Sequence, residues 1–465
     1  MQEPVTAMEP EMADAAPSVQ RVARLRAALA SGLASEVRGF CHELKAPDLA
    51  DMIELLAPEE RVELIQRLGA DFDPEVLSEL DSSVRDQISE ALPNAVLAKA
   101  VSALDTDDAA YVIEGLEEAD KQDVLSQIST SDRAALERNL EYPEETAGRL
   151  MQTDFVAVPP FWSVGQVIDH MREAKDLPET FSDIIVVDPS YRVLGSLDLS
   201  RLLRSKRHVG VASIMDTDRH EVLASADQEQ MARQFERYDL KSAPVVDENK
   251  RLVGVVTVDD VVEVIEEETG EDYRLLAGVG DESMSDSVLP TVKSRFLWLF
   301  VNLGTAILAS AVIKLFDASI EQMVALAVLM PIVASMGGNA GTQTMTVAVR
   351  ALATRDLGPA NANRVILREL AVGLINGAAF AVIMALVVVF WFGAGKLGLV
   401  IGAAMICNLF AAALAGILIP LALHRFGYDP AVASGVFVTT VTDVVGFFAF
   451  LGLATLFLLP LAPPT

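Results

Sequence analysis

The sequence of 465 residues is poor in two kinds of residue, and each shortage excludes a class of protein. It has two cysteines, Cys41 and Cys407, which lie far apart and indicate neither a disulfide framework nor a zinc site. Basic residues number 36 against 66 acidic ones, a net charge of −30. This excess opposes binding to nucleic acid or anionic lipid and favours metal cations, with a merely solubilising acidic surface as the alternative.

The start of the chain lacks the features of a signal peptide. Residues 1–19 have no basic first segment and no apolar run. We expect a disordered tail there.

Charge is divided unevenly along the chain. From Thr291 onward there are 9 Lys/Arg and 6 Asp/Glu residues, so residues 1–290 hold the other 27 and 60. The net charge is therefore −33 before Thr291 and +3 from there on. This predicts an acidic soluble part followed by an apolar transmembrane domain at residues 295–465.

A repeat of 12 residues runs through the first part of the chain. Turn-forming residues follow most of the apolar residues that recur at this period. The recurring positions are Leu56, Leu68, Leu80, Leu92, Leu104, Leu116, Ile128 and Leu140. Each unit predicts a short amphipathic helix and a tight turn. Because such a helix cannot bury its apolar face alone, the stacked units predict an α-solenoid N-domain at residues 20–145.

Two similar α/β segments follow, SDIIVVDPSYRVLGSLDLSRLL and KSAPVVDENKRLVGVVTVDDVV. Each has a β-branched run, a turn, a second strand and the start of a helix, and Gly195 and Gly254 correspond at an offset of 59 residues. The segments resemble a tandem pair of CBS (cystathionine β-synthase) domains, which we place at residues 146–265.

The CBS resemblance implies at most one nucleotide site. In that family a Ser/Thr and an Asp three residues later often hold an adenosine ribose. Thr257 and Asp260 have this spacing, whereas Asp198 and Arg201, at the corresponding positions of the first segment, do not fit. ATP is the nucleotide we consider for this site.

An acidic run, DDVVEVIEEETGEDYRLLAG, leads from the second segment into a connecting region at residues 266–294. On one helix, several of these carboxylates are i,i+3 and i,i+4 neighbours, which repel one another without counterions. Hard oxygen ligands suit Mg²⁺ or Ca²⁺, so the run predicts a sensor of divalent cations. A solvated acidic face is the alternative.

From Arg295 onward, five segments are long and apolar enough to cross a bilayer. We place them at 296–316, 321–349, 365–392, 398–424 and 431–459. Seven flanking basic residues fall on one side of these spans and two on the other. The positive-inside rule therefore predicts a cytoplasmic N-terminus and an external C-terminus.

The second span contains LAVLMPIVASMGGNAGTQTMTVAV, whose proline and paired glycines predict an interrupted helix. Freed backbone groups are tolerated at membrane depth only when they are buried in protein or line a wet cavity. A packing seam of small residues is the alternative. Because Asn-Ala-Gly-Thr-Gln is more polar than packing needs, we favour a pore or an ion site.

The fifth span contains one charged residue, Asp443, close to its centre. A lone carboxylate at this depth costs at least about 2.5–3.5 kcal/mol, so Asp443 should face water or an ion. The basic residues of the other spans lie near their ends. A transported cation is therefore the predicted partner, with a protonated aspartate in a proton relay as the alternative.

The order of these parts resembles the MgtE family of magnesium channels and transporters. The matching segments are YPEETAGRLM, the CBS pair, the acidic helix, RFLWLF, GGNAGTQ, ALATRDL and DPAVASGVFVTTVTDVVGF. The resemblance implies a homodimer in the plasma (inner) membrane whose helices enclose one pore. It also implies that Mg²⁺ is both the substrate and a regulatory ligand, and that the protein is not an enzyme.

The resemblance further implies particular site residues. Asp443 would meet its counterpart in the dimer and bind hydrated Mg²⁺, with Gly338, Asn339 and Thr342 beside it. Regulatory Mg²⁺ would bind acidic residues of the connecting helix and one residue at the inner end of the fifth span. By motif position these are Asp260, Glu263, Glu268, Glu271, Asp272 and Asp429.

Taken together, the sequence predicts a magnesium-selective channel or transporter. Mg²⁺ would enter the cytoplasm down its electrochemical gradient, and Mg²⁺ binding to the acidic module would close the pore. The nearest alternative is a proton-coupled carrier of divalent cations. An intramembrane aspartyl protease would need a second carboxylate beside Asp443, which only a dimer supplies. A CBS sensor whose main ligand is a nucleotide is the remaining alternative.

Overall fold

The computed structural model describes residues 19–174, 177–178, 180–280, 288–432 and 434–458. The tail expected at the start of the chain thus lies almost wholly outside the described residues. The chain divides into two compact units, one extending to Glu268 and the other comprising mainly the residues from Thr269 onward.

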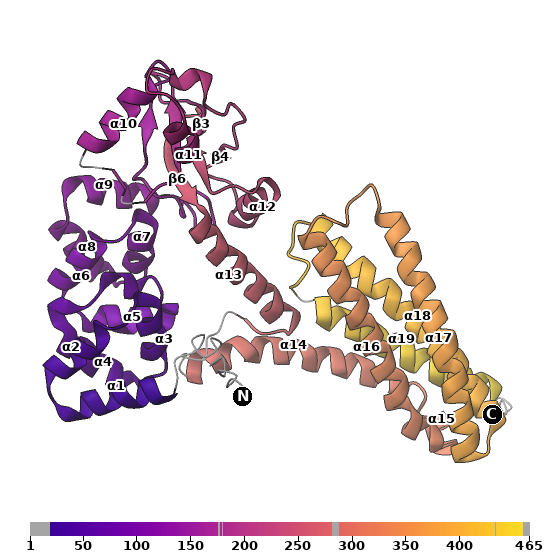
Figure 1. Ribbon diagram of the computed structural model, residues 1–465. Helices are drawn as coiled ribbons and strands as arrows, with labels where there is room; N and C mark the ends of the chain where they lie inside the picture. The colour runs from indigo at the N-terminus through magenta and orange to yellow at the C-terminus, as the bar shows by residue number, and fades with distance from the viewer. Residues whose placement is uncertain (1–18, 175–176, 179, 281–287, 433, 459–465) are drawn as a thin grey trace, which may run out of the picture. The chain divides into compact units, whose positions relative to one another are not determined.

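The N-domain of the first unit is a stack of short helices joined by tight turns (Figure 1). Its elements are α1 (Val19–Ser31), α2 (Ala34–Cys41), α3 (Ala46–Glu54), α4 (Pro58–Leu68), the 3₁₀ turns η1 (Gly69–Asp71) and η2 (Pro74–Leu77), α5 (Ser82–Ala91), α6 (Asn94–Val101), α7 (Thr106–Glu114), α8 (Glu118–Gln127) and α9 (Thr130–Asn139). All eight repeat positions lie in one apolar core or pack against it. The predicted α-solenoid is therefore confirmed, although 3₁₀ turns replace the helix of one repeat.

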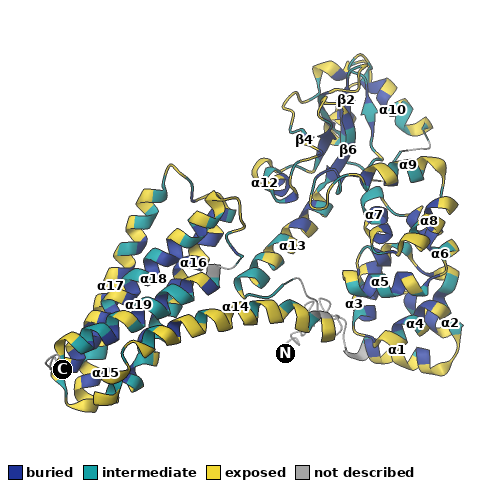
Figure 2. Cartoon of the chain, turned by 180° about the vertical axis from the view of Figure 1, so that it is seen from behind, coloured by how far each residue is buried: buried dark blue, intermediate teal, exposed yellow. Residues whose placement is uncertain are grey.

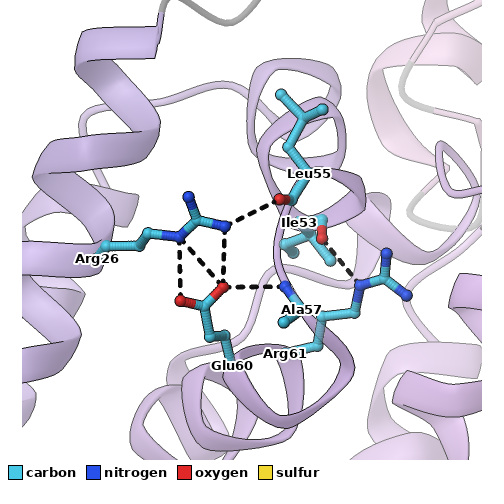
Figure 3. Close-up of polar contacts among 6 residues, drawn as sticks. All are labelled: Arg26, Ile53, Leu55, Ala57, Glu60 and Arg61. Atoms are coloured by element: carbon cyan, nitrogen blue, oxygen red, sulfur yellow. Dashed lines mark hydrogen bonds and ion pairs between the residues drawn. The ribbon is translucent and has the colours of Figure 1, made fainter.

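Polar contacts hold the turn between α3 and α4 in place (Figure 3). Nε of Arg26, in α1, bonds Oε1 of Glu60 at 3.0 Å, and Oε2 of Glu60 accepts the Ala57 N–H at 2.9 Å. Arg61 is 6% exposed and donates from Nε to the Ile53 carbonyl at 3.0 Å. These side chains pair backbone groups that the ends of α3 and α4 leave without helical partners.

The CBS pair consists of two three-stranded sheets with the same strand order. The first contains β1 (Ala157–Val158), β2 (Asp183–Val187) and β3 (Val193–Asp198), and the second β4 (Val222–Leu223), β5 (Ser242–Val246) and β6 (Leu252–Thr257). The accompanying helices are α10 (Val164–Glu173), α11 (Leu199–Arg204) and α12 (Gln228–Tyr238), with the 3₁₀ turn η3 (Val211–Ser213). Gly195 pairs with Val186 and Gly254 with Val245 in equivalent antiparallel registers, which confirms the internal duplication.

One continuous helix, α13 (Val258–Leu276), follows β6 directly and carries the acidic run. Its buried residues Val261 and Val264 pack in the core of the second CBS repeat. The boundary expected at residue 266 falls inside this helix, because the last helix of the CBS pair and the acidic helix form a single element.

The second unit is a helix bundle. It contains α14 (Val288–Lys314), α15 (Asp317–Gln322), α16 (Ala325–Ala353), α17 (Ala362–Phe392), α18 (Gly395–Arg425) and α19 (Ser434–Phe457). Among the described residues, five helices are long and apolar enough to cross a membrane, as the sequence predicted. α18 packs against α16, α17 and α19 and is the most buried, whereas α14 is almost entirely exposed (Figure 2).

The interruption predicted in the second span is wrong, because α16 is one continuous helix through Pro331 and its glycines. A proline in a helix removes only one backbone hydrogen bond, although it usually kinks the helix. The glycines of α16 do not unwind the helix, and they allow neighbouring helices to pack closely against it. A Cβ added at Gly337 would lie 2.1 Å from the Asn408 side chain of α18, and one added at Gly341 would lie 2.5 Å from Val438 of α19.

Candidate ion pathway and cation-sensing site

A row of polar side chains lies along an exposed face of α16. Ser335, Asn339, Thr342 and Thr346 are separated by four, three and four residues, and all are exposed in the single chain. This spacing places them on one side of the helix, whereas residues such as Val333 on the other side are buried. Polar groups that face hydrocarbon are unfavourable. This face of a membrane-spanning helix therefore requires water or another protein surface.

Asp443 lies near the middle of α19 and is partly exposed. Within the described part of the chain, no basic side chain pairs with its carboxylate. Thr439 lies one turn before it, and a Cβ added at Gly338 of α16 would lie 4.0 Å from Cγ2 of Thr439. The four residues predicted to line a pore thus lie on two helices that pack together.

A second group of carboxylates joins the N-domain to α13 within the first unit. Burial, and then the charges of Asp260 and Glu263 on α13, raise the pKa of Asp108 in α7 to about 7. Burial and the charge of Asp260 likewise raise the pKa of Asp107 well above its ordinary value. The pKa of Glu263 is raised to about 7, by burial first and the Asp260 charge second. We call Asp107, Asp108, Asp260 and Glu263 the acidic cluster.

Two members of the acidic cluster carry oxygens suited to a cation. Burial raises the pKa of Asp260 to about 6, although the Thr257 hydroxyl and N–H donate to its Oδ2 at 2.7 and 3.2 Å. Oδ1 of Asp107 is shielded from solvent and accepts no hydrogen bond from any described residue. A buried acceptor without a donor is costly, and a bound cation or its water would provide the missing partner.

The acidic cluster does not have the geometry to coordinate a dehydrated metal ion directly. Among the residues that the structure describes, no three His, Cys, Asp or Glu side chains are grouped so as to hold a metal directly. Mg²⁺ usually keeps several waters and binds through one or two carboxylates. The arrangement therefore suits a hydrated ion between α7 and α13.

Sequence reasoning missed Asp107 and Asp108. The segment DTDDAA contains them, but acidic residues at a helix N-terminus are ordinary because they complement the helix dipole. Only the fold brings the first turn of α7 beside α13, more than 150 residues later in the chain.

Glu268 lies apart from the acidic cluster. Gln228 donates to its Oε1 at 2.8 Å. Burial and the charge of Asp227 raise the pKa of Glu268, while the Gln228 hydrogen bond opposes that rise. Glu268 therefore belongs to a separate polar contact between α12 and α13.

The remaining predicted regulatory residues lie in the second unit. Glu271 and Asp272 are on the last part of α13. Asp429 lies in the turn before α19, where its Oδ1 accepts the Ala431 N–H at 2.7 Å. Of the six residues predicted from the resemblance, three thus lie in the first unit and three in the second.

The two CBS repeats differ at the position considered for a nucleotide. In the second repeat, Thr257 and Asp260 are hydrogen-bonded to each other. In the first, Asp198 accepts the Ser200 N–H at 2.7 Å and Arg201 donates to the Ile214 carbonyl at 3.0 Å. At these two aligned positions, the second repeat has a hydroxyl and a carboxylate, whereas the first has a carboxylate and a guanidinium.

The sequence is similar to known proteins along most of its length. Family models match at residues 330–453 (MgtE, divalent cation transporter), 44–145 (MgtE intracellular N domain) and 147–208 and 211–267 (CBS domain). The magnesium transporter MgtE of Bacillus subtilis is 30% identical over 94% of this chain and 97% of its own length. That of Thermus thermophilus is 37% identical over 70% of this chain and 73% of its own length.

A solved cytosolic domain of the Mg²⁺ channel MgtE, in complex with ATP, is 33% identical, covers 52% of this chain and 99% of its own, and has a TM-score of 0.49. The curated relatives are named as transporters and not as enzymes. The family models together match the helical N-domain, the CBS pair and the membrane helices from the second span onward. The chain therefore belongs to the MgtE family of magnesium transporters and is a multi-pass membrane protein.

Proposed function

We propose that Mg²⁺ crosses the membrane through a pore lined by α16 and α19 of two copies of the chain. The observation that supports this most is the exposed polar face of α16, a helix that packs against α19, which carries Asp443. Carboxylate, amide and hydroxyl oxygens are the ligands that a hard cation prefers. A second copy facing the first would cover this polar face and bring two Asp443 carboxylates to one hydrated ion.

Transport through this pore is inward and needs no coupled fuel. An inside-negative potential supplies about 2.3 kcal/mol per elementary charge per 100 mV, and a divalent ion gains about twice that. Binding through water is weaker than direct ligation and allows the ion to leave as well as to enter.

The acidic cluster closes the pore when cytosolic Mg²⁺ is high. Without a cation, Asp107 and Asp108 repel Asp260 and Glu263, and the N-domain separates from α13. With Mg²⁺ between them, the compact arrangement is favoured. The ion shifts this equilibrium only by binding the compact state better than the open one. Glu268, Glu271, Asp272 and Asp429 contribute further regulatory contacts.

The orientation places the acidic module in the cytoplasm and the C-terminus outside the plasma (inner) membrane, in line with the basic residues around the spans. The test uses single cysteines introduced at either end of the chain, in a background of Cys41→Ala and Cys407→Ala. An impermeant thiol reagent applied to intact cells should label only the C-terminal cysteine. Labelling of the N-terminal one would reverse the topology.

Thr257 and Asp260 form the site we propose for the ribose of ATP. The hydroxyl and the carboxylate are 2.7 Å apart and already oriented toward each other. ATP binding to the full-length protein in detergent should weaken at least tenfold in Thr257→Val, which keeps the shape and removes the hydroxyl. Equal binding by both proteins would exclude this residue.

The deciding experiment for the pore is Mg²⁺ uptake by proteoliposomes that contain the wild type or Asp443→Asn. This change keeps the size of the side chain and removes its charge, so we expect uptake to fall at least tenfold. Glu321→Gln is the matched control, because Glu321 is an exposed carboxylate of α15 outside the spans. Uptake by Asp443→Asn at the wild-type rate would contradict the pore.

The same vesicles separate a channel from a proton-coupled carrier. A potential without a pH gradient should drive uptake, and a pH gradient at zero potential should not. Uptake driven by the pH gradient alone would favour the carrier.

A further inference from the structure

Asn408 is a buried polar residue near the middle of α18, the helix that contacts α16, α17 and α19. Its exposed fraction is 0%. Its Nδ2 donates a hydrogen bond of 2.8 Å to the Val333 carbonyl in α16. Its Oδ1 is shielded from solvent and has no hydrogen-bond partner among the described residues. A half-satisfied amide at the centre of an apolar bundle is unfavourable for stability.

Two glycines from different helices enclose this amide. A Cβ added at Gly337 of α16 would lie 2.1 Å from Nδ2 of Asn408, and one added at Gly446 of α19 would lie 2.7 Å from the same atom. Any side chain at either glycine would therefore displace the amide. Asn408 holds α16 by a hydrogen bond and α19 by direct packing.

Both points of contact adjoin the residues of the proposed pore. Gly337 precedes Asn339 by two residues, and Gly446 follows Asp443 by three, so each is within one helical turn. A shift or rotation of either helix against Asn408 therefore moves the oxygens of Asn339 and Asp443 relative to each other.

We propose that Asn408 is a positioning residue that sets the spacing between Asp443 and Asn339, and thereby the affinity and maximal rate of Mg²⁺ transport. The inference rests on the pore proposed above. Because Asn408 is fully buried within one chain, it does not touch the ion and acts only through α16 and α19.

The competing explanation is that the amide only holds the helices together, since interhelical hydrogen bonds commonly do so in membranes. The two explanations differ for Asn408→Leu. Leucine has a similar volume and removes both the donor and the unpaired oxygen. If the amide only held the helices together, a folded Asn408→Leu protein would transport Mg²⁺ at the wild-type rate.

The first experiment measures Mg²⁺ uptake against Mg²⁺ concentration for the wild type and Asn408→Leu in proteoliposomes, per amount of folded protein. We expect a thermal midpoint no lower than that of the wild type. We also expect a maximal rate at least tenfold lower or a half-saturating concentration changed at least threefold. A variant that matches the wild type in both kinetic values would overturn the proposal.

A second pair of variants decides the matter even if leucine prevents folding. Asn408→Ala leaves a space beside α19 that the methyl group of Gly446→Ala can fill. We expect the double variant to recover thermal stability relative to Asn408→Ala, while its uptake stays at least tenfold below the wild type. Uptake restored to within twofold of the wild type would mean that packing alone suffices, and the proposal would fail.

Asp443→Asn in the same assay separates this inference from the proposed pore. If Asp443→Asn stops uptake while the Asn408 variants transport normally, only the positioning role is lost. If Asp443→Asn transports normally, the pore itself is wrong, whatever the Asn408 variants do.

Discussion

The hydroxyl of Thr257 donates a hydrogen bond of 2.7 Å to Oδ2 of Asp260, and the side chain of Gln152 donates to the same oxygen at 3.4 Å. No described residue donates a hydrogen bond to the other oxygen, Oδ1. The carboxylate is therefore fixed in orientation by its own helix terminus while one oxygen stays available. Substitutions in the acidic cluster therefore test how charge acts within the first unit.

If the acidic cluster closes the pore as proposed, Glu263→Gln should weaken the inhibition of transport by Mg²⁺ on the side of the membrane that holds the cluster. The change removes one carboxylate from the acidic cluster, so Mg²⁺ loses part of its preference for the compact state. We expect the inhibitory concentration to rise about tenfold, which corresponds to about 1.4 kcal/mol of binding free energy. Glu266→Gln is the control, because it makes the same change of charge at a position of the same helix outside the acidic cluster. Equal inhibition of both variants would argue against gating through the cluster.

The stability of the first unit without Mg²⁺ should fall as the pH rises from about 4.5 to about 7. The pKa values of Asp108 and Glu263 are raised to about 7 in the folded state, from ordinary values of 3.8 and 4.5. The unfolded chain therefore gives up these protons at lower pH than the folded one, and the folded state loses stability across that interval. The pKa of Asp198 is lowered to about 2, chiefly by hydrogen bonds from Ser200, so this carboxyl titrates below this pH interval.

Denaturant unfolding at several pH values in EDTA, with a parallel series in saturating Mg²⁺, measures this dependence. Mg²⁺ should flatten it, because the ion neutralises the same carboxylates. A stability in EDTA that rises between pH 5 and 7 would show that other groups dominate.

Arg61→Ala should lower the free energy of unfolding of the N-domain by about 1–3 kcal/mol. Arg61 is buried and donates to the Ile53 and Glu54 carbonyls at 3.0 and 2.7 Å, so its loss leaves two acceptors at the end of α3 unpaired. Arg133→Ala is the comparison, because Arg133 and Glu137 form an exposed pair worth about 0–1 kcal/mol. Denaturant titration monitored by circular dichroism measures both, and equal effects would contradict the assigned role of Arg61.

Cys41 should resist alkylation in the native protein. Burial raises the pKa of its thiol to about 11, and the side chain is 7% exposed, so the reactive thiolate is scarce and shielded at pH 8. In a Cys407→Ala background we expect iodoacetamide to react at least 100-fold more slowly with native than with unfolded protein. Rapid labelling under native conditions would mean that the N-domain core opens readily.

The sequence predicted the parts of the structure that depend on periodic patterns. The 12-residue spacing from Leu56 to Leu140 located the solenoid core, because a helix of two to three turns must bury one face per repeat. The offset between Gly195 and Gly254 similarly predicted two sheets with one register. Apolar length alone was enough to predict the membrane helices.

The errors and omissions all concern contacts between segments far apart in the chain. Gly337 was interpreted as a helix breaker, because its neighbour Asn408 lies on another helix and cannot be paired with it by spacing. Asp107 and Asp108 resembled ordinary acidic residues at a helix start until the fold brought them beside α13. Asn408 is an amide within an otherwise apolar span, so the sequence alone marks it as unusual, although no role was predicted for it.

The helical stack of the N-domain has a mechanical consequence. Its packing contacts join helices that are close in sequence, such as α6 with α8 and α7 with α9, so the apolar core extends along the stack from repeat to repeat. Under tension such an array yields by peeling from a terminus, one repeat after another, instead of breaking all at once. When the N-domain is stretched from its two ends, the recorded extension should therefore increase in a series of small steps of similar length, one for each repeat that unfolds.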